Sequence, residues 1–482
     1  MSKQGPLKVA YIAPDFDEKA ASGGLYVIFE HCNALIAKGH HVRVFNDYGK
    51  KSRYLKLDCS VERHHYDTSA IDSWKPDIAV ATHWRTFYFV QRLDSPVSCG
   101  TKLFYLIQSD ERYVVNESLT PFYLRTITGK GAAGEPFRKI AVSRYLQKML
   151  KSDFGEDSVY IPNGIRVKDV PPLLERSERV RVIARYDPSK FRGWGMVDSA
   201  LKKLSVQRPD VEIHLFEMKK KKPTEYKSAI HIGQTGDSML GLFRSCDIFL
   251  AANEKEGFSY PVLEAMSQGS CVCCTDAGGN MDFCIDGKTA LVAPAHDNTK
   301  LYNNLMRLVD DAALRKEISD NGIAKAHEFN WDSSTGMLER AFISAASEKA
   351  PARQAHDAVP RRQGHILMIW EKDPFTDQAE WMEFDGAIRR AWQESSRLDV
   401  IVMADRHPMK SARSFLDMLL PKEMAASVDT VVLYHKKFPV LPKGVALSLF
   451  RGAVRVKAAI RAIKGARYSS VLRYPDDKPK IA

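Results

Sequence analysis

The stretch of sequence that decides the fold is Glu254-Lys255-Glu256-Gly257-Phe258-Ser259-Tyr260-Pro261-Val262-Leu263-Glu264-Ala265-Met266. It places two carboxylates, Glu256 and Glu264, around a turn that ends in Pro261. Proline suits the first position of a helix, because its fixed φ fits the helix and its missing N–H is not needed there. We therefore predict that a helix starts over residues 261–268. The positive end of its dipole, with both carboxylates nearby, indicates a site for an anion or a polyol.

Predicted strands and helices alternate around this stretch. Short apolar runs indicate strands at 7–14, 41–45, 77–82, 102–108, 139–143, 180–184, 211–216, 230–232 and 248–251. Amphipathic runs indicate helices at 26–38, 145–154, 196–207, 237–245, 298–310, 312–329 and 331–348. Such alternation is typical of parallel sheets covered by helices. A proline-containing linker at 170–178 interrupts it, so we predict two consecutive parallel α/β domains, with a ligand of two parts between them.

Candidate binding residues follow two strands of the first predicted domain. Gly23 and Gly24 precede a helix, where bare N–H groups can approach a phosphate or a sugar; the alternative is a simple turn. His83 follows the strand at 77–82, on the sheet edge where ligands bind in open parallel sheets. Its alternative is an ordinary hydrogen-bonding loop residue. The absence of a GxGxxG motif counts against a dinucleotide enzyme.

A loop of the second predicted domain carries three cations, Arg185, Lys190 and Arg192. Arginine binds phosphate oxygens through paired hydrogen bonds, so this loop is a candidate diphosphate site. The alternative is a solvated basic loop. The basic run at 219–222 has no interleaved aromatic residues and is interpreted as a solvated loop.

Composition excludes several classes of protein. The chain has 482 residues, of which 44% are apolar and 27% charged, as in ordinary globular proteins. No apolar run approaches the roughly 18 residues that span a bilayer, and the N-terminus lacks signal-peptide features, so we expect a cytoplasmic protein. Cys271, Cys273 and Cys274 do not have zinc-site spacing and are predicted to be buried strand thiols, without a metal.

The opening stretch belongs to a wider set of motifs. The run from Glu256 to Gly269 resembles the EGFG-x-P-x-x-EAM-x-x-G signature of glycosyltransferase family 4. It is accompanied, in the family's order over residues 7–348, by Ser22-Gly23-Gly24, Ala141-Val142-Ser143, Ile161-Pro162-Asn163-Gly164, Thr275-Asp276-Ala277-Gly278-Gly279, Asp286-Gly287 and Phe329-Asn330-Trp331. The resemblance implies an α/β GT-B fold, with two Rossmann-like parallel-sheet domains facing across a cleft.

The same resemblance implies a retaining glycosyltransferase that needs no metal or other cofactor and takes a nucleotide-diphosphate sugar as donor. Carried over by position, Glu256 would bind hydroxyls of the donor sugar and Glu264 those of the ribose. His83 would lie beside the sugar near the reacting centre. His83 and Glu256 are therefore the expected catalytic residues.

The resemblance also assigns the remaining donor-binding candidates. Arg185 and a basic partner, either Lys190 or Arg192, would hold the diphosphate. The other donor-binding residues would be Gly23, Gly24, Gly257, Phe258, Ser259 and Tyr260. Asp282 stands where the family often has Glu, and we expect this shorter side chain to affect sugar selectivity.

The predicted domains are an N-terminal, acceptor-side domain at 1–170, a nucleotide-sugar domain at 179–350 and an α/β extension at 365–482. In the extension, strands are expected at 365–370, 400–404 and 430–434, and helices at 379–395 and 411–419. Residues 434–482 hold 12 Lys and Arg against two Asp, a net charge of +10 within the total of +12.

A basic amphipathic helix is expected at 443–467 within this tail. Such a helix can lie on an anionic membrane, which predicts possible peripheral association with the inner face of the membrane, where a lipid-linked acceptor is found. The alternative is a helix packed on its own protein. Without interleaved aromatic residues the tail does not predict nucleic-acid binding.

These observations favour transfer of a sugar to a glycan, glycolipid or other acceptor. The alternative from another class is a non-catalytic subunit that binds nucleotide sugars or glycans. A sugar-nucleotide epimerase is not expected to carry the EGFG-type motif. A hydrolase with two catalytic carboxylates is disfavoured, because Glu264 would be held by the nucleotide.

Overall fold

The computed structural model describes residues 5–14, 23–45, 62–64, 68–91, 93, 95–113, 120–131, 134–175, 177–188, 192–217 and 225–348, and the strands 365–370, 397–404, 428–435 and 470–474. By its internal contacts the chain divides into two units. The larger unit holds residues 1–83, 101–113 and 137–349 and contains two parallel sheets. The other holds residues 84–100, 114–136 and 350–482.

The first sheet of the larger unit has seven parallel strands in the order β3-β2-β1-β4-β5-β6-β7. They are β1 (Lys8–Ile12), β2 (His41–Phe45), β3 (Glu62–His64), β4 (Ile78–Ala81), β5 (Lys102–Ile107), β6 (Arg138–Ala141) and β7 (Ser158–Tyr160). Its helices are α1 (Gly23–Ala37), α2 (Thr68–Trp74) and α6 (Arg144–Phe154), with the short η1 (Glu111–Tyr113). The predicted strands of this sheet are confirmed to within about two residues. Their apolar residues are buried because helices cover both faces of a parallel sheet, which is why short apolar runs marked these strands in the sequence.

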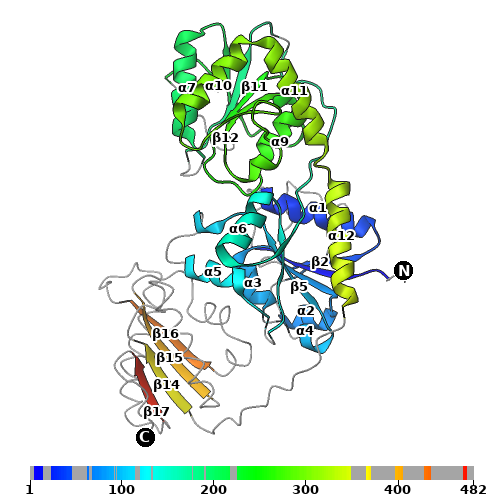
Figure 1. Ribbon diagram of the computed structural model, residues 1–482. Helices are drawn as coiled ribbons and strands as arrows, with labels where there is room; N and C mark the ends of the chain where they lie inside the picture. Colours follow the sequence, from blue (N-terminus) through cyan, green and yellow to red (C-terminus); the bar gives the residue numbers. More distant parts are fainter. Residues whose placement is uncertain are drawn as a thin grey trace. The chain divides into compact units, whose positions relative to one another are not determined.

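The second sheet has six parallel strands in the order β10-β9-β8-β11-β12-β13. They are β8 (Arg181–Arg185), β9 (Glu212–Glu217), β10 (Ala229–Ile232), β11 (Ile248–Ala251), β12 (Cys271–Thr275) and β13 (Leu291–Ala293). Helices α7 (Trp194–Gln207) and α10 (Asn298–Asp310) pack together, as do α8 (Asp237–Arg244), α9 (Tyr260–Ser267) and α11 (Ala312–His327). Figure 1 shows β11 and β12 between these two groups of helices.

Both sheets reverse their strand order beside their first strand. In the first sheet β1 pairs with both β2 and β4, and in the second β8 pairs with both β9 and β11. In open parallel sheets, ligands bind at the carboxyl ends of the strands beside such a reversal. The expectation of two parallel α/β domains is confirmed, and the reversal points locate their binding edges.

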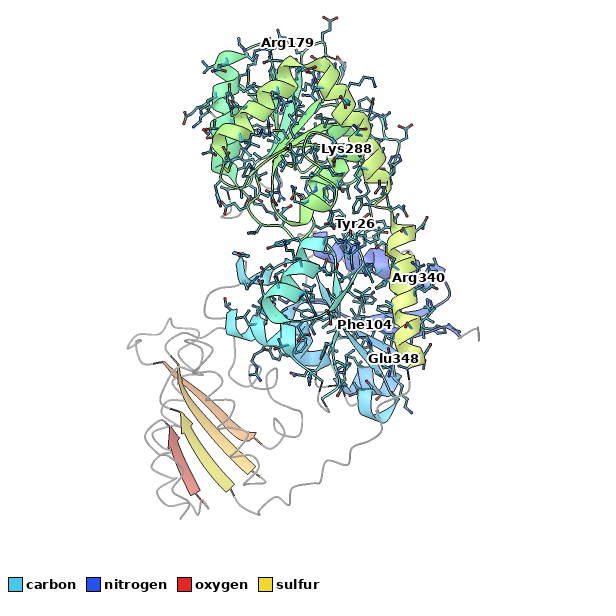
Figure 2. The ribbon with its side chains drawn as sticks, viewed as in Figure 1. Tyr26, Phe104, Arg179, Lys288, Arg340 and Glu348 are labelled. Carbon is cyan, nitrogen blue, oxygen red and sulfur yellow. The ribbon has the colours of Figure 1, made fainter. Side chains whose placement is uncertain are left out.

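The last helix of the larger unit, α12 (Trp331–Ser347), packs on the first sheet although it follows the second in sequence. Phe342 of α12 meets Phe104 of β5 edge-on, with ring centroids 4.8 Å apart. Figure 2 labels Phe104 of β5 and Arg340 of α12. Glu339 forms an ion pair with Lys38, at 2.7 Å. We therefore call the first sheet with α1, α2, α6 and α12 the first lobe, and the second sheet with α7–α11 the second lobe. The predicted domain boundaries had grouped α12 with the second sheet.

The other unit contains α3 (Trp84–Val90), α4 (Ser95–Ser98), α5 (Thr120–Thr128) and a four-stranded parallel sheet in the order β16-β15-β14-β17. Its strands are β14 (His365–Trp370), β15 (Arg397–Ala404), β16 (Val428–His435) and β17 (Ser470–Tyr474). Three of the four were predicted. The predicted helices at 379–395, 411–419 and 443–467 lie outside the described residues. Among the described residues, no helix has the length and apolar character needed to cross a bilayer.

Cys271, Cys273 and Cys274 are buried in a strand, as predicted. Strand β12 is buried along its whole length, including Cys271, Cys273 and Cys274. All three carry free thiols. Burial raises the pKa of Cys271 to about 12, so this thiol stays protonated and unreactive at neutral pH. The three residues are part of the core of the second lobe.

Candidate active site

The candidate site lies at the carboxyl ends of β8 and β11, the two strands beside the reversal of the second sheet. Arg185 is the last residue of β8, and the loop with Glu256 follows β11. The predicted helix is α9, which begins at Tyr260, one residue before the proline. Strand pairing thus brings together Arg185 and Glu256, which are 71 positions apart in the chain.

The basic loop after β8 places two guanidinium groups beside each other. Arg185 Nη2 lies 3.2 Å and Arg192 Nε 3.6 Å from the same oxygen, Asp187 Oδ2. Burial, and then the charge of Arg192, lower the pKa of Arg185. An arginine whose charged form is disfavoured by burial and by a second cation would be stabilised by a bound anion. Arg192 is therefore a partner cation of Arg185, whereas Lys190 lies outside the described residues.

Glycine at position 193 makes this arrangement possible. Gly193 has φ +61° and lies so close to Ala252 that an added Cβ would be 1.7 Å from the Ala252 carbonyl oxygen. Only glycine combines that backbone conformation with such an approach. The contact holds the basic loop against the residues that follow β11, and so brings Arg192 to Glu256.

Glu256 is the carboxylate at the centre of the site. Its side chain is only 8% exposed, and its Oε1 forms an ion pair with Arg192 Nη1. Its Oε2 is buried and has no hydrogen-bond partner among the described residues. A buried charged oxygen without a donor is costly, so a hydroxyl donated by a ligand would be favourable there.

Glu264 lies inside helix α9 in a different environment. Burial raises its pKa to about 7. The neighbouring Tyr260 packs edge-on against Tyr26 of α1, with ring centroids 5.7 Å apart. Burial also raises the pKa of Tyr260, and its hydroxyl has no hydrogen-bond partner among the described residues. Glu264 therefore lies beside a contact between the two lobes.

The residues between the carboxylates have different surroundings. Phe258 is buried against Phe283 and Phe329, so its ring belongs to the packing and only its backbone could reach a donor. Gly257 lies against the carbonyl of Gln108 in the first lobe. Ser259 caps α9 with φ +76°, and its buried hydroxyl has no hydrogen-bond partner among the described residues.

The glycine pair of the first lobe lies across from this region. Helix α1 begins at Gly23, three residues earlier than predicted, so Gly23 and Gly24 form its first turn. A Cβ on Gly23 would be 3.4 Å from the ring of Tyr260. Gln108 Nε2 donates to the carbonyl of Gly24, at 3.2 Å. The pair is therefore next to the second lobe, as a contact with a shared ligand requires.

His83 follows β4 at the reversal point of the first sheet. Its Nε2 lies 3.5 Å from Glu111 Oε2 in η1. A carboxylate beside an imidazole orients the ring. Sequence reasoning missed Glu111, as it missed Asp187, because a single acid in a loop has no distinguishing pattern. Their position just after a strand was the available signal.

Part of this chain matches a known protein family. Residues 216–325 match the model of the family described as glycosyl transferases group 1. The resemblance predicted from the sequence is confirmed at this level. The group 1 segment includes both Glu256 and Glu264, but not Arg185 or Arg192.

Curated relatives of this chain include a phosphatidyl-myo-inositol mannosyltransferase from Mycolicibacterium smegmatis, 26% identical over 44% of this chain and 58% of the relative. A D-inositol 3-phosphate glycosyltransferase from Stackebrandtia nassauensis is 28% identical over 27% of this chain and 29% of the relative. The chain thus spans less than two thirds of the curated relatives that it matches.

Solved structures establish the fold. Sucrose-phosphate synthase from Thermosynechococcus elongatus is similar with a TM-score of 0.57 and 16% identity, over 70% of this chain and all of that one. HepE from Anabaena, solved with UDP-glucose, has a TM-score of 0.56 at 14% identity, with the same coverage. The predicted GT-B fold, with two Rossmann-like lobes, is confirmed.

Proposed function

We propose that this protein is a retaining glycosyltransferase that moves a sugar from a nucleotide-diphosphate sugar to a glycan, glycolipid or other acceptor without a metal or other cofactor. One observation carries the proposal: Arg185, Arg192 and the buried, half-satisfied carboxylate of Glu256 meet at the carboxyl ends of β8 and β11. The match to glycosyl transferases group 1 and a GT-B relative solved with UDP-glucose support it.

Each group has a role that its chemistry fits. Arg185 and Arg192 neutralise the diphosphate, which gains negative charge as it departs. Glu256 accepts a hydrogen bond from a hydroxyl of the donor sugar through Oε2. Glu264 accepts hydrogen bonds from the ribose. His83, oriented by Glu111, lies on the sugar side of the reacting centre.

The reaction breaks the bond between the anomeric carbon and the diphosphate oxygen, and the electron pair leaves with the diphosphate. The acceptor hydroxyl attacks the anomeric carbon from the face that the diphosphate leaves, and its proton passes to the departing phosphate oxygen. The anomeric configuration is therefore retained. The protein contributes positioning and charge stabilisation, and no covalent sugar–enzyme intermediate forms.

Arg192 links donor binding to the state of Glu256. Before the donor binds, Arg192 is paired with Glu256 and lies beside Asp187. A diphosphate carries more charge than one carboxylate and would draw Arg192 towards it. Glu256 Oε1 would then also be free to accept a sugar hydroxyl. Donor binding would thereby release Glu256 from Arg192, so that both carboxylate oxygens could accept hydrogen bonds from the sugar.

The acceptor is proposed by chemical class. The curated relatives are named for transfer to phosphatidyl-myo-inositol and to D-inositol 3-phosphate, which favours a polar or lipid-linked polyol. Binding of the basic segment 443–467 to the cytoplasmic, inner face of the membrane would bring the protein to a lipid-linked acceptor. This segment lies outside the described residues, so its role rests on sequence alone.

The variant Glu256→Gln tests the assignment. We expect its kcat for sugar transfer to fall roughly 100-fold or more, as when one transition-state hydrogen bond is lost. Transfer is followed by mass spectrometry with a panel of nucleotide sugars, and the product anomer by NMR. Glu254→Gln is the matched control, because Glu254 is half-buried two residues earlier and is 3.9 Å from His296.

Glu254→Gln should keep wild-type turnover. Wild-type turnover in Glu256→Gln would refute the role of Glu256, and an inverted product anomer would refute retention. Donor binding by the wild-type protein with no transfer to any acceptor would favour the non-catalytic subunit instead.

A further inference from the structure

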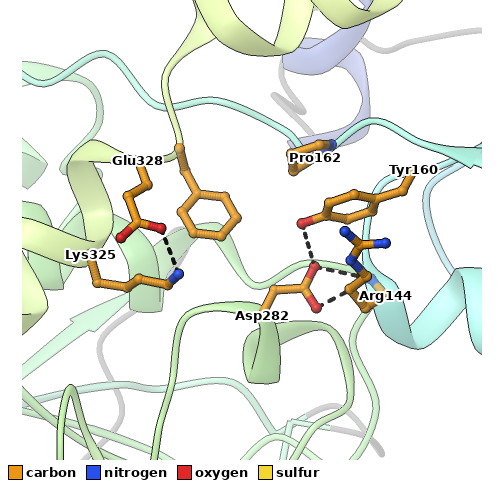
Figure 3. Close-up of a pocket in the computed structure, with 7 residues that line it drawn as sticks. Arg144, Tyr160, Pro162, Asp282, Lys325 and Glu328 are labelled. Carbon is orange, nitrogen blue, oxygen red and sulfur yellow. Dashed lines mark hydrogen bonds and ion pairs between the residues drawn. The ribbon is translucent and has the colours of Figure 1, made fainter.

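Asp282 of the second lobe makes its hydrogen bonds with the first lobe. It ends the short helix η3 (Gly279–Asp282), which follows the second glycine pair. Its Oδ2 accepts from the backbone N–H of Arg144, at 3.0 Å, and from the hydroxyl of Tyr160, at 2.9 Å. Figure 3 shows these bonds at one side of a cavity of about 290 Å³. The expected effect of Asp282 on sugar selectivity therefore has an alternative, a role in joining the lobes.

The carboxylate completes the capping of helix α6. Arg144 is the first residue of α6, and Ser143 already caps the helix from within the first lobe by accepting from Leu146 N–H at 3.2 Å. The Arg144 N–H is left without an acceptor inside the helix. Asp282 provides that acceptor from the second lobe, at the positive end of the helix dipole.

Neighbouring contacts strengthen the same junction. The guanidinium of Arg144 lies over the ring of Tyr160, 3.9 Å from its centroid, and so holds the Tyr160 side chain near Asp282. Gly278 has φ +83°, and an added Cβ would be 2.7 Å from Cγ of Tyr145. A larger residue at 278 would therefore push η3 away from α6.

The junction is connected to Glu256 by backbone hydrogen bonds. Gly279 N–H donates to the Glu256 carbonyl at 3.0 Å, and Glu256 N–H donates to the Ala277 carbonyl at 2.8 Å. The segment that carries Asp282 therefore also supports the backbone of Glu256. A displacement of η3 from α6 would displace Glu256.

We propose that Asp282 is a positioning residue that clasps the two lobes: its carboxylate caps α6 across the lobe boundary and thereby fixes the backbone that carries Glu256. The clasp is a property of the fold, whereas its effect on sugar transfer rests on the proposed function. The lobes would separate more readily without it, and Glu256 would be less well placed at the moment of reaction.

Hydrogen exchange measured on peptides covering residues 139–150 tests the clasp without any substrate. In Asp282→Ala we expect exchange at the start of α6 to be at least about tenfold faster, as for a lost charge-assisted hydrogen bond. Asp282→Glu, which keeps a carboxylate, should restore most of the protection. Glu328→Gln is the matched control, because Glu328 lines the same cavity but pairs with Lys325 at 2.6 Å.

Unchanged exchange at α6 in Asp282→Ala would overturn the clasp. Faster exchange spread equally over α10 and α12 would also overturn it, because it would show a general role in folding. These outcomes do not depend on catalysis. A wild-type protein with a working clasp but no transfer activity would refute the proposed function and leave the clasp standing.

The kinetic arm of the test separates positioning from donor binding. Asp282→Ala should lower kcat about tenfold and change the KM for the donor less than threefold, because misplacement of a group affects the transition state most. Tyr160→Phe should lower kcat less, and the double variant should be no slower than Asp282→Ala, since Tyr160 acts through Asp282. If the fold-decreases in kcat of the two single variants multiplied in the double variant, the two residues would act independently, and this would contradict the clasp.

Discussion

Two carboxylates of the opening motif differ sharply at the scale of single residues. Glu256 is paired with Arg192 and has one oxygen without a hydrogen-bond partner among the described residues, whereas Glu264 forms no ion pair among those residues and has a pKa raised by burial. Residue type alone does not predict this difference in environment, because both are glutamates beside a helix start. The difference arises from Arg192, which the glycine at 193 brings to Glu256 from another strand.

The raised pKa of Glu264 predicts a pH-dependent affinity for the donor. In the role proposed for Glu264, the ionised carboxylate accepts hydrogen bonds from the ribose better than the protonated form does, and burial raises its pKa to about 7. A proton therefore competes with the donor below pH 7. We expect the Kd of a nucleotide sugar, measured by calorimetry, to fall by about tenfold between pH 6 and pH 8.

Glu264→Gln removes the titrating group and should make the affinity nearly independent of pH. Glu254→Gln should keep the wild-type pH dependence. An unchanged pH dependence in Glu264→Gln would assign the titration to another residue.

At the scale of elements, the start of α9 contains a strained residue. Ser259 occupies the position that is glycine in the EGFG signature, and its φ of +76° is the conformation that favours glycine. Ser259→Gly should therefore stabilise the protein against unfolding, by about 1 kcal/mol. Urea unfolding measures this change.

Ser267→Gly is the control, because Ser267 lies inside the last turn of the same helix, where glycine should destabilise by roughly 0.5–1 kcal/mol. The buried Ser259 hydroxyl has no hydrogen-bond partner among the described residues, so we expect it to contact the donor and Ser259→Gly to raise the KM for the donor. A less stable Ser259→Gly would show that the strain is compensated by contacts of the serine.

Secondary structure was the part of the fold that sequence patterns predicted best. The helix from Tyr260 and the strand His41–Phe45 follow from a proline at a helix start and from a buried apolar run. Strands β3 and β13 have only three residues each and were missed. Runs of that length contain too few apolar residues to show a period.

At the scale of the whole molecule, contacts between distant segments were beyond prediction. Local patterns identify α12 as a helix, but not that it packs on the first lobe, because that depends on Phe342 reaching Phe104. The same holds for Asp282, whose partners Arg144 and Tyr160 are 138 and 122 residues away. Candidate residues were found where a known motif or a basic loop after a strand marked them, whereas the acidic partners Asp187 and Glu111 were missed.

Arg185, Arg192 and Glu256 are proposed to hold the donor together, and direct binding tests this role. Thermal and chemical unfolding are measured with a panel of UDP, GDP, dTDP and ADP sugars. At 100 times its dissociation constant, one of these donors should stabilise the wild-type protein by about 2.7 kcal/mol. The double variant Arg185→Ala/Arg192→Ala should show little of this stabilisation. Stabilisation by none of these donors, or by an equal amount in the double variant, would contradict the account.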